Sequence, residues 1–453
     1  AIATAGVGLG AAGCSFDRSG LDDDGRPGDG GADDATSPDS GPCPEPFVIS
    51  LAIDGVTSGA PRTRVLVGDT VTLAATGSCS QRGPLSYVWQ ISPIDDSRET
   101  ARPTLTAATV TLYPVLPREY TVQLTVSDGV ASDSVDALFV AHGFTEQTGV
   151  DNDVRDLAVG GGRLWIATRT GAFRSDDLDD PTTFTDLESE VDGDAEDALP
   201  DGFDTVYFDD DDQALWLGDK DAAAGVHRVD YGGGAPTSDL VRYDGLDGFV
   251  TDAETHDIAA FGDGIAVGTS LGATIAADGA DPVFGAPFLL GVEMCAVADR
   301  DGLWGGGLRV YAQEGDLSVE PFGETDDKVR ALLPDPTGGE LWVGSDGFGV
   351  ASLDAAGAVM ARYTKESGDL PTNHVRAIAT EPSGPFLGDL WLATDKGIAR
   401  FKRDRETWFD YGNTEGLMGH ADVRAITVAI DPGNGRRTIW GGVNGGLVYM
   451  RTP

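Results

Sequence analysis

One position of a repeated sequence phrase holds a basic residue in several copies along the chain. Arg155, Arg330, Arg376 and Arg424 each follow the first Val of a repeated phrase, and His256 holds the same position in a weaker copy. A guanidinium group presents a planar fork of donors that fits carboxylate and similar oxyanions. If each phrase starts a strand of one closed ring, these side chains surround one mouth of that ring. We therefore expect a cationic site for a uronate, a sulfate or a carboxylate.

Other polar residues are expected at the same mouth, namely Asn373, His374 and His420. Together with His256, the two histidines leave metal binding and His-assisted catalysis open. No metal-ligand or catalytic motif accompanies them, so we assign neither a metal site nor a catalytic residue.

A second interpretation of the repeated arginines is structural. An Arg at a repeated strand start can pair with nearby carboxylates, here Asp153 or Asp422, and so lock neighbouring units together. Both interpretations stay open, and the structural one is favoured because a repeated position is often one that the fold itself needs.

Acidic residues dominate the composition. The 453 residues include 31 Lys and Arg against 75 Asp and Glu, for a formal charge of −44. This excludes a nucleic-acid binder that works through a basic field, because phosphate affinity comes from Lys and Arg. The acidic runs Asp22–Asp24 and Asp209–Asp212 indicate solvated surface charge, with calcium as the minor alternative and no other cofactor expected.

The N-terminal stretch from Ala1 to Gly13 is apolar and built of small residues, and it ends at Cys14. It resembles the processing site of bacterial lipoproteins, which implies that Cys14 is lipidated and that any membrane contact runs through this anchor. An ordinary secretion signal is the alternative for residues 1–14. Residues 15–46 are rich in Asp, Gly and Pro, so we expect a disordered acidic linker. No apolar run of about 20 residues follows, and we expect no membrane-spanning helix.

Residues 47–141 alternate in polarity, in runs such as VTLAAT, LSYVWQIS and YTVQLTVSD. Such runs predict an antiparallel sandwich. Tyr87 and Trp89 fall on one face of a strand, so a core role is favoured over stacking on a sugar. The segments GDTVTLAATGSCSQRGPLSYVWQIS and REYTVQLTVSDGVASDS resemble the polycystic-kidney-disease (PKD) type of immunoglobulin-like repeat, with Tyr120 opening a late strand. This resemblance implies an extracellular spacer or a module that contacts carbohydrate or protein.

Residues 142–453 repeat one phrase, clearest as VRDLAVGGGRLWIATRTGAFR from Val154 and VRAIATEPSGPFLGDLWLATDKGIARF from Val375. Each unit predicts four antiparallel strands, which is the pattern of a propeller blade. We expect the repeated tryptophans to be packing anchors, and Trp408 and Phe409 to make exposed contacts. The anchor positions of the seven units are Trp165, Trp216, Ala266, Trp304, Trp342, Trp391 and Trp440.

The seventh unit stops at Pro453 after its third strand. The stretch from Gly143 to Gln147 precedes the first unit as an outer strand would, so we expect it to complete the seventh unit and close the ring. The phrase resembles the two-component-regulator propeller repeat, which couples a V-x-x-I strand to an LWxGT strand and a following Gly-Leu. That family implies a propeller that serves as an extracytoplasmic sensing or binding region.

The cysteines give a weaker indication of the compartment. Cys43 and Cys79 are the pair that would join the linker to the sandwich in an oxidising compartment, although sequence alone does not fix connectivity. Cys295 falls in a predicted strand and is expected to be a buried thiol.

The expected fold is therefore all-β: a seven-bladed β-propeller with an N-terminal immunoglobulin-like (PKD-type) sandwich and a disordered acidic linker. The expected function is that of an extracytoplasmic binding or scaffolding protein of the bacterial cell envelope, or a secreted one, with a carbohydrate or protein ligand. Two alternatives stay open, namely a ligand-sensing component of a signalling system and a lyase or hydrolase acting at the channel mouth. The sequence gives no strong sign of oligomerisation.

Overall fold

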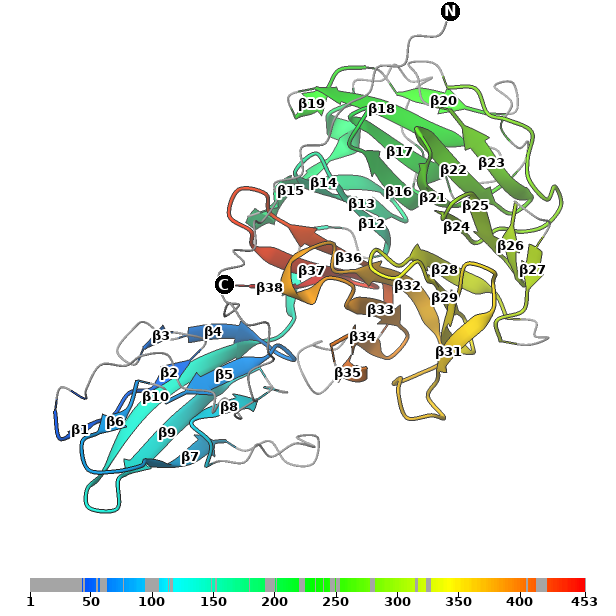
Figure 1. Cartoon of the computed structure of the whole chain (residues 1–453). Coiled ribbons are helices and arrows are strands. Elements are labelled where there is room, and N and C mark those ends of the chain that lie inside the picture. Colours follow the sequence, from blue (N-terminus) through cyan, green and yellow to red (C-terminus); the bar gives the residue numbers. More distant parts are fainter. Residues whose placement is uncertain are drawn as a thin grey trace, which may run out of the picture.

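Strands make up nearly all the regular structure of the chain in the computed structural model (Figure 1). The structure describes residue 43 and residues 45–452, apart from 54–55, 58–62, 76, 94–105, 113, 115–116, 148, 151–152, 179, 192–199, 201, 220–224, 233, 239, 245–248, 250–252, 278–281, 314–316, 323–326, 405 and 413–421. Within these residues the helices are single 3-10 turns, and none is long and apolar enough to cross a membrane.

Two four-stranded sheets face each other in the N-terminal part. One has the order β3 (Val56–Thr57), β2 (Ala52–Ile53), β5 (Val71–Ala74) and β8 (Thr109–Leu112); the other has β4 (Thr63–Leu66), β10 (Ser132–His142), β9 (Glu119–Ser127) and β7 (Ser86–Ser92). Every second side chain of β9 is buried, starting at Tyr120, and these meet Trp89 and Leu73 in one core. Trp89 also donates its indole N–H to the Ala107 carbonyl at 2.8 Å, so its expected core role is confirmed.

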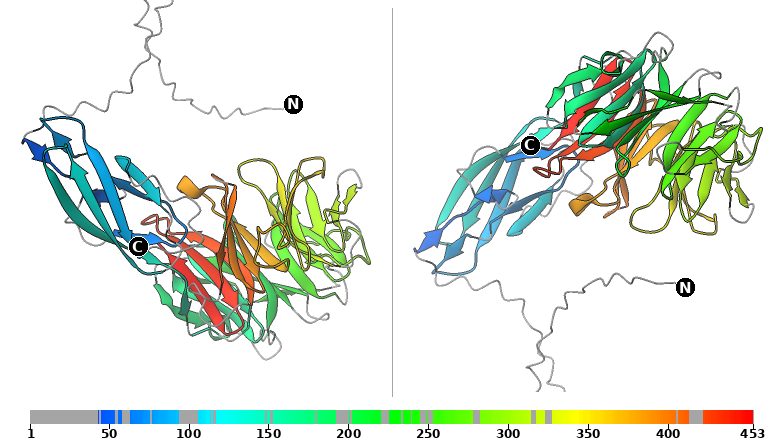
Figure 2. Two further views of the ribbon diagram at one scale, coloured as in Figure 1. Left: turned by 90° about the horizontal axis from the view of Figure 1, so that it is seen from below. Right: turned by 90° about the horizontal axis from the view of Figure 1, so that it is seen from above.

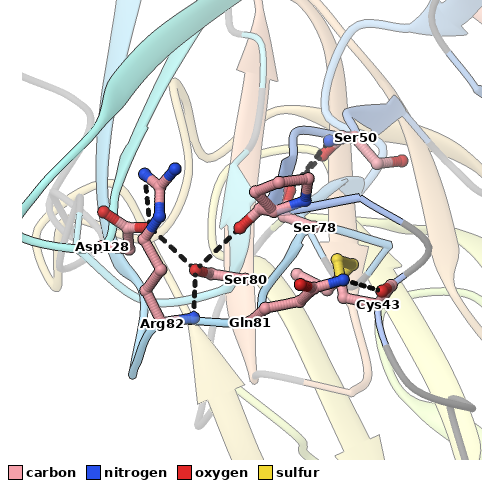
Figure 3. The surroundings of a disulfide bond; sticks show 9 residues. Cys43, Ser50, Ser78, Ser80, Gln81, Arg82 and Asp128 are labelled. Carbon is pink, nitrogen blue, oxygen red and sulfur yellow. Dashed lines mark hydrogen bonds and ion pairs between the residues drawn. A yellow bond between two sulfur atoms is a disulfide. The ribbon is translucent and has the colours of Figure 1, made fainter.

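A disulfide joins Cys43 to Cys79 and ties the start of the described chain to the sandwich (Figure 3). The bond lies beside the small sheet of β1 (Phe47–Val48) and β6 (Cys79–Ser80). The Gln81 side chain donates to the Cys43 carbonyl at 2.7 Å, and Ser80 donates to Asp128 at 2.7 Å. The pairing suggested for these two cysteines is confirmed, and Cys295 is the expected buried free thiol, although it lies one residue before the strand Ala296–Asp299 and not within it.

Seven further sheets are present among the described residues. Each has one strand that starts a repeat, which we call its first strand, and the sheets are numbered by the sequence order of these first strands, namely β12, β16, β21, β24, β28, β32 and β36. Sheet 1 has β12 (Val154–Gly160), β13 (Arg163–Thr168), β14 (Gly171–Asp177) and β15 (Asp180–Asp186). Sheet 2 has β16 (Phe203–Asp209), β17 (Ala214–Asp219) and β18 (Val226–Gly232), with β19 (Ala235–Pro236) and β20 (Val241–Tyr243) both on β18. Sheet 3 has β21 (Thr255–Phe261), β22 (Gly264–Thr269) and β23 (Gly272–Ala276).

Sheet 4 has β24 (Ala296–Asp299), β25 (Leu303–Gly306), β26 (Val310–Ala312) and β27 (Leu317–Val319). Sheet 5 has β28 (Val329–Pro334), β29 (Leu341–Ser345), β30 (Gly349–Leu353) and β31 (Val359–Tyr363). Sheet 6 has β32 (Val375–Thr380), β33 (Leu390–Thr394), β34 (Gly397–Lys402) and β35 (Thr407–Tyr411). Sheet 7 has β36 (Val423–Ile430), β37 (Arg437–Val443), β38 (Gly446–Arg451) and β11 (Thr145–Gln147).

The first strands of these sheets lie next to one another in a closed circuit. β12 contacts β16, and the series continues through β21, β24, β28, β32 and β36 back to β12. In Figure 2 the sheets follow one another around this circuit, from the green strands to the red ones. β11, far upstream in sequence, pairs antiparallel with β38, so one sheet holds both ends of this part of the chain.

The repeated tryptophans fill the space between neighbouring sheets. Trp165 stacks on Phe208 of sheet 2 with ring centroids 4.9 Å apart, and Trp391 and Trp440 are completely buried. The prediction that these positions are packing anchors is therefore confirmed. The prediction of exposed contacts for Trp408 and Phe409 is wrong: both are half-buried, and Trp408 packs 5.0 Å from Phe401.

Sheet 3 departs from the four-stranded pattern. Beyond β23 the described residues form only isolated bridges, Ala273 to Phe288 and Ala276 to Phe284. Pro282 precedes this stretch and Pro287 lies within it, and a proline cannot donate to a strand ladder. The stretch therefore runs beside β23 without joining it as a regular strand.

The sandwich sits against sheets 6 and 7 through the turn between β4 and β5 (Figure 1). Gly68 has φ +80°, and a Cβ there would lie 2.5 Å from the Tyr411 hydroxyl, so the turn needs glycine to approach this closely. Tyr411 donates to the Val67 carbonyl at 3.0 Å, and its ring is part of one continuous apolar cluster with the sandwich core.

Candidate functional site

The repeated Arg and His position is a β-bulge. In six of the seven described sheets the pairing of the first strand skips one residue, as between Val154 and Asp156 or between Val375 and Ala377. A bulged residue is left out of the ladder and its side chain is re-aimed, which is why bulges are frequent next to functional sites. The six bulged residues are Arg155, Asp204, His256, Arg330, Arg376 and Arg424.

Carboxylates from neighbouring sheets meet these cations in a chain of ion pairs. Asp153 contacts Arg155 at 3.2 Å and also pairs with Arg424 of sheet 7. Asp422 contacts Arg424 at 3.4 Å and Arg376 of sheet 6 at 2.7 Å. The pairing with Asp153 and Asp422 that the structural interpretation predicts is therefore confirmed for these three arginines. We call this set, Asp153, Arg155, Arg376, Asp422 and Arg424, the charged belt.

A second arc of contacts between basic side chains and carboxylates continues over sheets 3 to 6. Glu293 contacts Lys328 at 2.6 Å and His256 at 3.4 Å. Asp346 contacts Arg330 at 3.5 Å and the His374 ring at 3.2 Å. Burial lowers the pKa of His256, which favours the neutral imidazole. Burial, the largest single effect, would raise the pKa of Glu293, but the hydrogen bond and charge of Lys328 together with smaller contributions from Cys295 and His256 outweigh it, so the pKa falls and the carboxylate stays charged.

Two half-buried aspartates lie one residue beyond the bulge. Asp156 accepts from the Val206 amide at 3.0 Å and from the Thr205 hydroxyl at 2.8 Å, which joins sheets 1 and 2. Asp257 accepts from the Val297 amide at 2.8 Å and joins sheets 3 and 4 in the same way. Desolvation raises the pKa of Asp257 to about 7 and also raises that of Asp156. The sequence feature that could have identified this pair is an Asp in the first and third repeats, at the position where the later repeats have Ala.

The remaining expected site residues divide into two groups. Asn373 donates to Glu366 at 2.8 Å and accepts from the Lys365 amide at 2.7 Å, so it orders its own turn. His420 and the lipidation candidate Cys14 lie outside the described residues. The structure therefore places all five expected Arg and His side chains of the first strands, and His374, beside carboxylates, with the four arginines in ion pairs.

Metal and nucleophile chemistry find little support in the part of the chain that the structure describes. No group of three or more His, Cys, Asp and Glu is placed there to hold a metal ion. In the Asp209–Asp212 turn, Asp209 accepts from the Asp211 amide at 2.9 Å and Asp210 accepts from the Gly161 amide at 2.7 Å. Burial raises the pKa of Cys295 to about 11, so this thiol stays protonated and is a poor nucleophile.

The arrangement is suited to recognition of charge. Every cation of the belt already faces a carboxylate, so an anionic ligand has to compete with an internal acid for each guanidinium. A guanidinium has five N–H donors, and an ion pair with one carboxylate leaves some of them available to a second acceptor. The belt can thus bind a ligand or partner that carries charges of both signs.

Comparisons with known proteins give information about the fold. No protein-family model matches the sequence, and no curated protein does. Among solved structures, the extracellular domain assigned to the hybrid two-component system BT3049 of B. thetaiotaomicron matches with a TM-score of 0.50 and 19% identity, over 68% of this chain and 41% of that one. The extracellular domain assigned to the one-component system BT4673 of the same organism matches with a TM-score of 0.41 and 14% identity, over 72% and 50%. The chain is thus similar in fold to an extracellular domain and spans less than half of its length.

Proposed function

We propose that this protein is an extracytoplasmic binding protein whose ring of sheets is the binding head. We take the ring, residues 142–453, to be a seven-bladed β-propeller closed by β11. We take residues 47–141 to be an immunoglobulin-like sandwich of the PKD type. Residues 15–46 would be an acidic linker behind a signal or lipid-anchor segment at 1–14.

The proposed location is supported by the disulfide between Cys43 and Cys79. Disulfides persist in oxidising compartments and are rare in the bacterial cytoplasm. The cell envelope or the exterior is therefore the expected place, with lipidation of Cys14 as the proposed route to the membrane.

The observation that carries the binding function is the bulge at the start of six first strands. It puts Arg155, Arg376 and Arg424 outside the strand ladder at the same end of three adjacent sheets. A packing role alone does not require an extra residue at the same place in six of the seven repeats. We infer that this end of the ring contacts the ligand, and that the ligand is a charged carbohydrate or a protein surface.

A sensing role is the second candidate, and the fold likeness to an extracellular domain of a two-component system favours it. In that case ligand binding would change the association of the protein with a signalling partner. A lyase or hydrolase remains the weaker alternative, and it predicts turnover that is lost when His256 or His374 is replaced.

The test is binding of the whole chain to an array of acidic and neutral glycans at low and high salt. We expect hits on acidic glycans that weaken in high salt, because exposed charge pairs are screened. The variant Arg376→Ala should lose these hits, whereas Arg242→Ala, which removes an exposed arginine of β20, should keep them. Unchanged binding by Arg376→Ala would contradict the proposed site, and no hit on any glycan would turn the search to protein partners.

A further inference from the structure

A cavity of about 300 Å³ lies where the sandwich meets the ring. The sandwich contributes Arg64 of β4 and His142 at the end of β10. The ring contributes Arg436, Tyr449 of β38 and Arg451. Figure 1 shows the end of β38 beside β4, where the chain reaches its C-terminus. The volume is at the lower end of the range for small-molecule sites.

The charge of this cavity is opposite to that of the protein. Its described lining is Arg64, His142, Gly143, Thr145, Arg436, Tyr449, Arg451 and Thr452, which includes three arginines and no acidic residue. The chain as a whole has 75 acidic residues against 31 basic ones. A positive cavity on such a surface attracts anions selectively, because the surrounding negative field repels them elsewhere.

Several lining groups are held in place by the protein. Arg451 donates to the Thr438 hydroxyl at 2.9 Å and to the Leu178 carbonyl, and its guanidinium lies 5.9 Å from the Tyr449 ring centre. Thr452 is fixed by its hydrogen bonds to the Arg437 backbone. Preorganised donors of this kind lose little entropy when a ligand binds.

One lining group has unused hydrogen-bonding capacity. Nε2 of His142 is buried and has no hydrogen-bond partner among the described residues. Arg64 lies on the strand beside it, since β4 and β10 pair in parallel with Arg64 opposite Val140. A buried ring nitrogen without a partner costs free energy, and a ligand in the cavity can supply the partner.

We propose that this cavity is a binding site for a small oxyanion, a molecule of about the size of citrate that carries carboxylate, phosphate or sulfate groups. Arg64 and Arg436 contact its charged oxygens from the two sides, and Arg451 holds it from the ring. The site is separate from the charged belt and goes beyond the function proposed above. Because its walls come from both the sandwich and the ring, an occupied site joins the two parts.

The experiment is isothermal titration of the whole chain at low ionic strength with citrate, inorganic phosphate and inorganic sulfate, and with glycerol as a neutral probe. We expect at least one anion to bind and glycerol not to bind. Citrate as the best probe would assign the site to carboxylates, and phosphate or sulfate as the best probe would assign it to those groups. Binding of the anion should also raise the Tm, because a ligand that binds the native state stabilises it.

Two charge-removing variants locate the site, Arg64→Gln and Arg436→Gln. Each should weaken anion binding by about tenfold or more, since each removes a charge-assisted hydrogen bond. Arg242→Gln on β20 and Arg376→Gln in the charged belt should bind within about twofold of the parent, because neither lines the cavity. A loss in the Arg376→Gln variant that equals the loss in Arg64→Gln would overturn the assignment, as would equal affinity for glycerol or no binding of any anion.

A third variant tests whether the anion binds inside the cavity, by filling the cavity with a larger side chain. Thr145 is exposed on β11 opposite Tyr449, so Thr145→Trp fits the strand and fills the space. We expect it to abolish anion binding while circular dichroism shows a folded protein. Full anion affinity in this variant would place the bound anion outside the cavity and contradict the proposal.

Discussion

Nη1 of Arg400 donates to Oδ1 of Asp69 at 2.7 Å, although 331 residues separate them. Arg400 lies on β34 of sheet 6 and is completely buried, and Asp69 lies in the turn between β4 and β5 of the sandwich. The other oxygen of Asp69 accepts from Arg437 of sheet 7 at 2.7 Å. One carboxylate of the sandwich thus binds two arginines of the ring.

The two arginines also have partners within the ring. Arg400 donates to Asp389 at 2.9 Å, and Arg437 donates to Glu381 at 3.1 Å. Glu381 in turn accepts from the Trp391 indole at 3.0 Å. Breaking such a network leaves charges in a low-dielectric interior without compensation. The sandwich is therefore fixed to sheets 6 and 7 and does not swing as a free spacer.

Replacing Asp69 by Ala should destabilise the protein strongly. We expect a loss of about 3 kcal/mol in the free energy of unfolding, because both guanidiniums lose a buried partner. Guanidinium chloride unfolding followed by tryptophan fluorescence measures it. Asp69→Asn, which keeps an acceptor, should lose less. Asp136→Ala on the exposed face of β10 is the matched control and should change stability by at most about 0.5 kcal/mol. Equal losses for Asp69→Ala and Asp136→Ala would contradict the role of the network.

The sequence predicts features that each repeat specifies locally. The tryptophan anchors can be found from their spacing, because each one packs within its own sheet and the next, as Trp165 does on Phe208. The pairing of Thr145–Gln147 with β38 is likewise the one that the repeats indicate, since the seventh unit has only three strands after its start. The fourth strand of sheet 3 was not predicted correctly, because two prolines interrupt its ladder.

Features that depend on distant parts of the chain could not be predicted in this way. The sequence marks Arg155 and Arg376 as repeated but does not reveal the bulge that re-aims them, since a bulge is a property of pairing register. Asp69 is one Asp among many until the fold brings it to Arg400. The sequence likewise does not mark the cavity arginines as neighbours, because Arg64 and Arg451 are close only in the folded protein.

Asp257 should make stability depend on pH. Its pKa is raised to about 7 in the folded protein and is near 4 in an unfolded chain. Between these values the folded state keeps a proton that the unfolded state releases, so stability falls as pH rises from about 4 to 7. Asp257→Asn should flatten this fall, because the amide cannot release a proton. Unfolding midpoints of the parent and the variant at pH 4.5 and 7.5 measure the effect, and parallel curves for the two proteins would contradict it.

The disulfide should stabilise the sandwich. The Cys43–Cys79 bond closes a loop with a sequence separation of 36, for which chain-entropy arguments give about 3–4 kcal/mol. Cys79→Ser should therefore lower the temperature at which the sandwich unfolds. Cys295→Ser, which removes the buried free thiol and keeps the disulfide, is the control and should lose stability in reductant as the parent does, whereas Cys79→Ser should behave the same with and without reductant. Calorimetry with and without reductant makes the comparison, and a parent protein insensitive to reductant would contradict the prediction.

A double-mutant cycle on Asp153 and Arg424 decides how far the charged belt serves the fold. The pair joins sheets 1 and 7, and both side chains are less than a quarter exposed, at 16% and 23%. We expect a coupling energy of about 1 kcal/mol between Asp153→Asn and Arg424→Gln at low salt, reduced in high salt because partly exposed pairs are screened. Asp133→Asn with Arg424→Gln is the matched control and should be additive. A strong coupling means that Arg424 is held by the ring, so that a ligand has to add to the pair and cannot replace it. Additive effects of Asp153→Asn and Arg424→Gln would mean that the ion pair contributes little to stability and that Arg424 is available to a ligand.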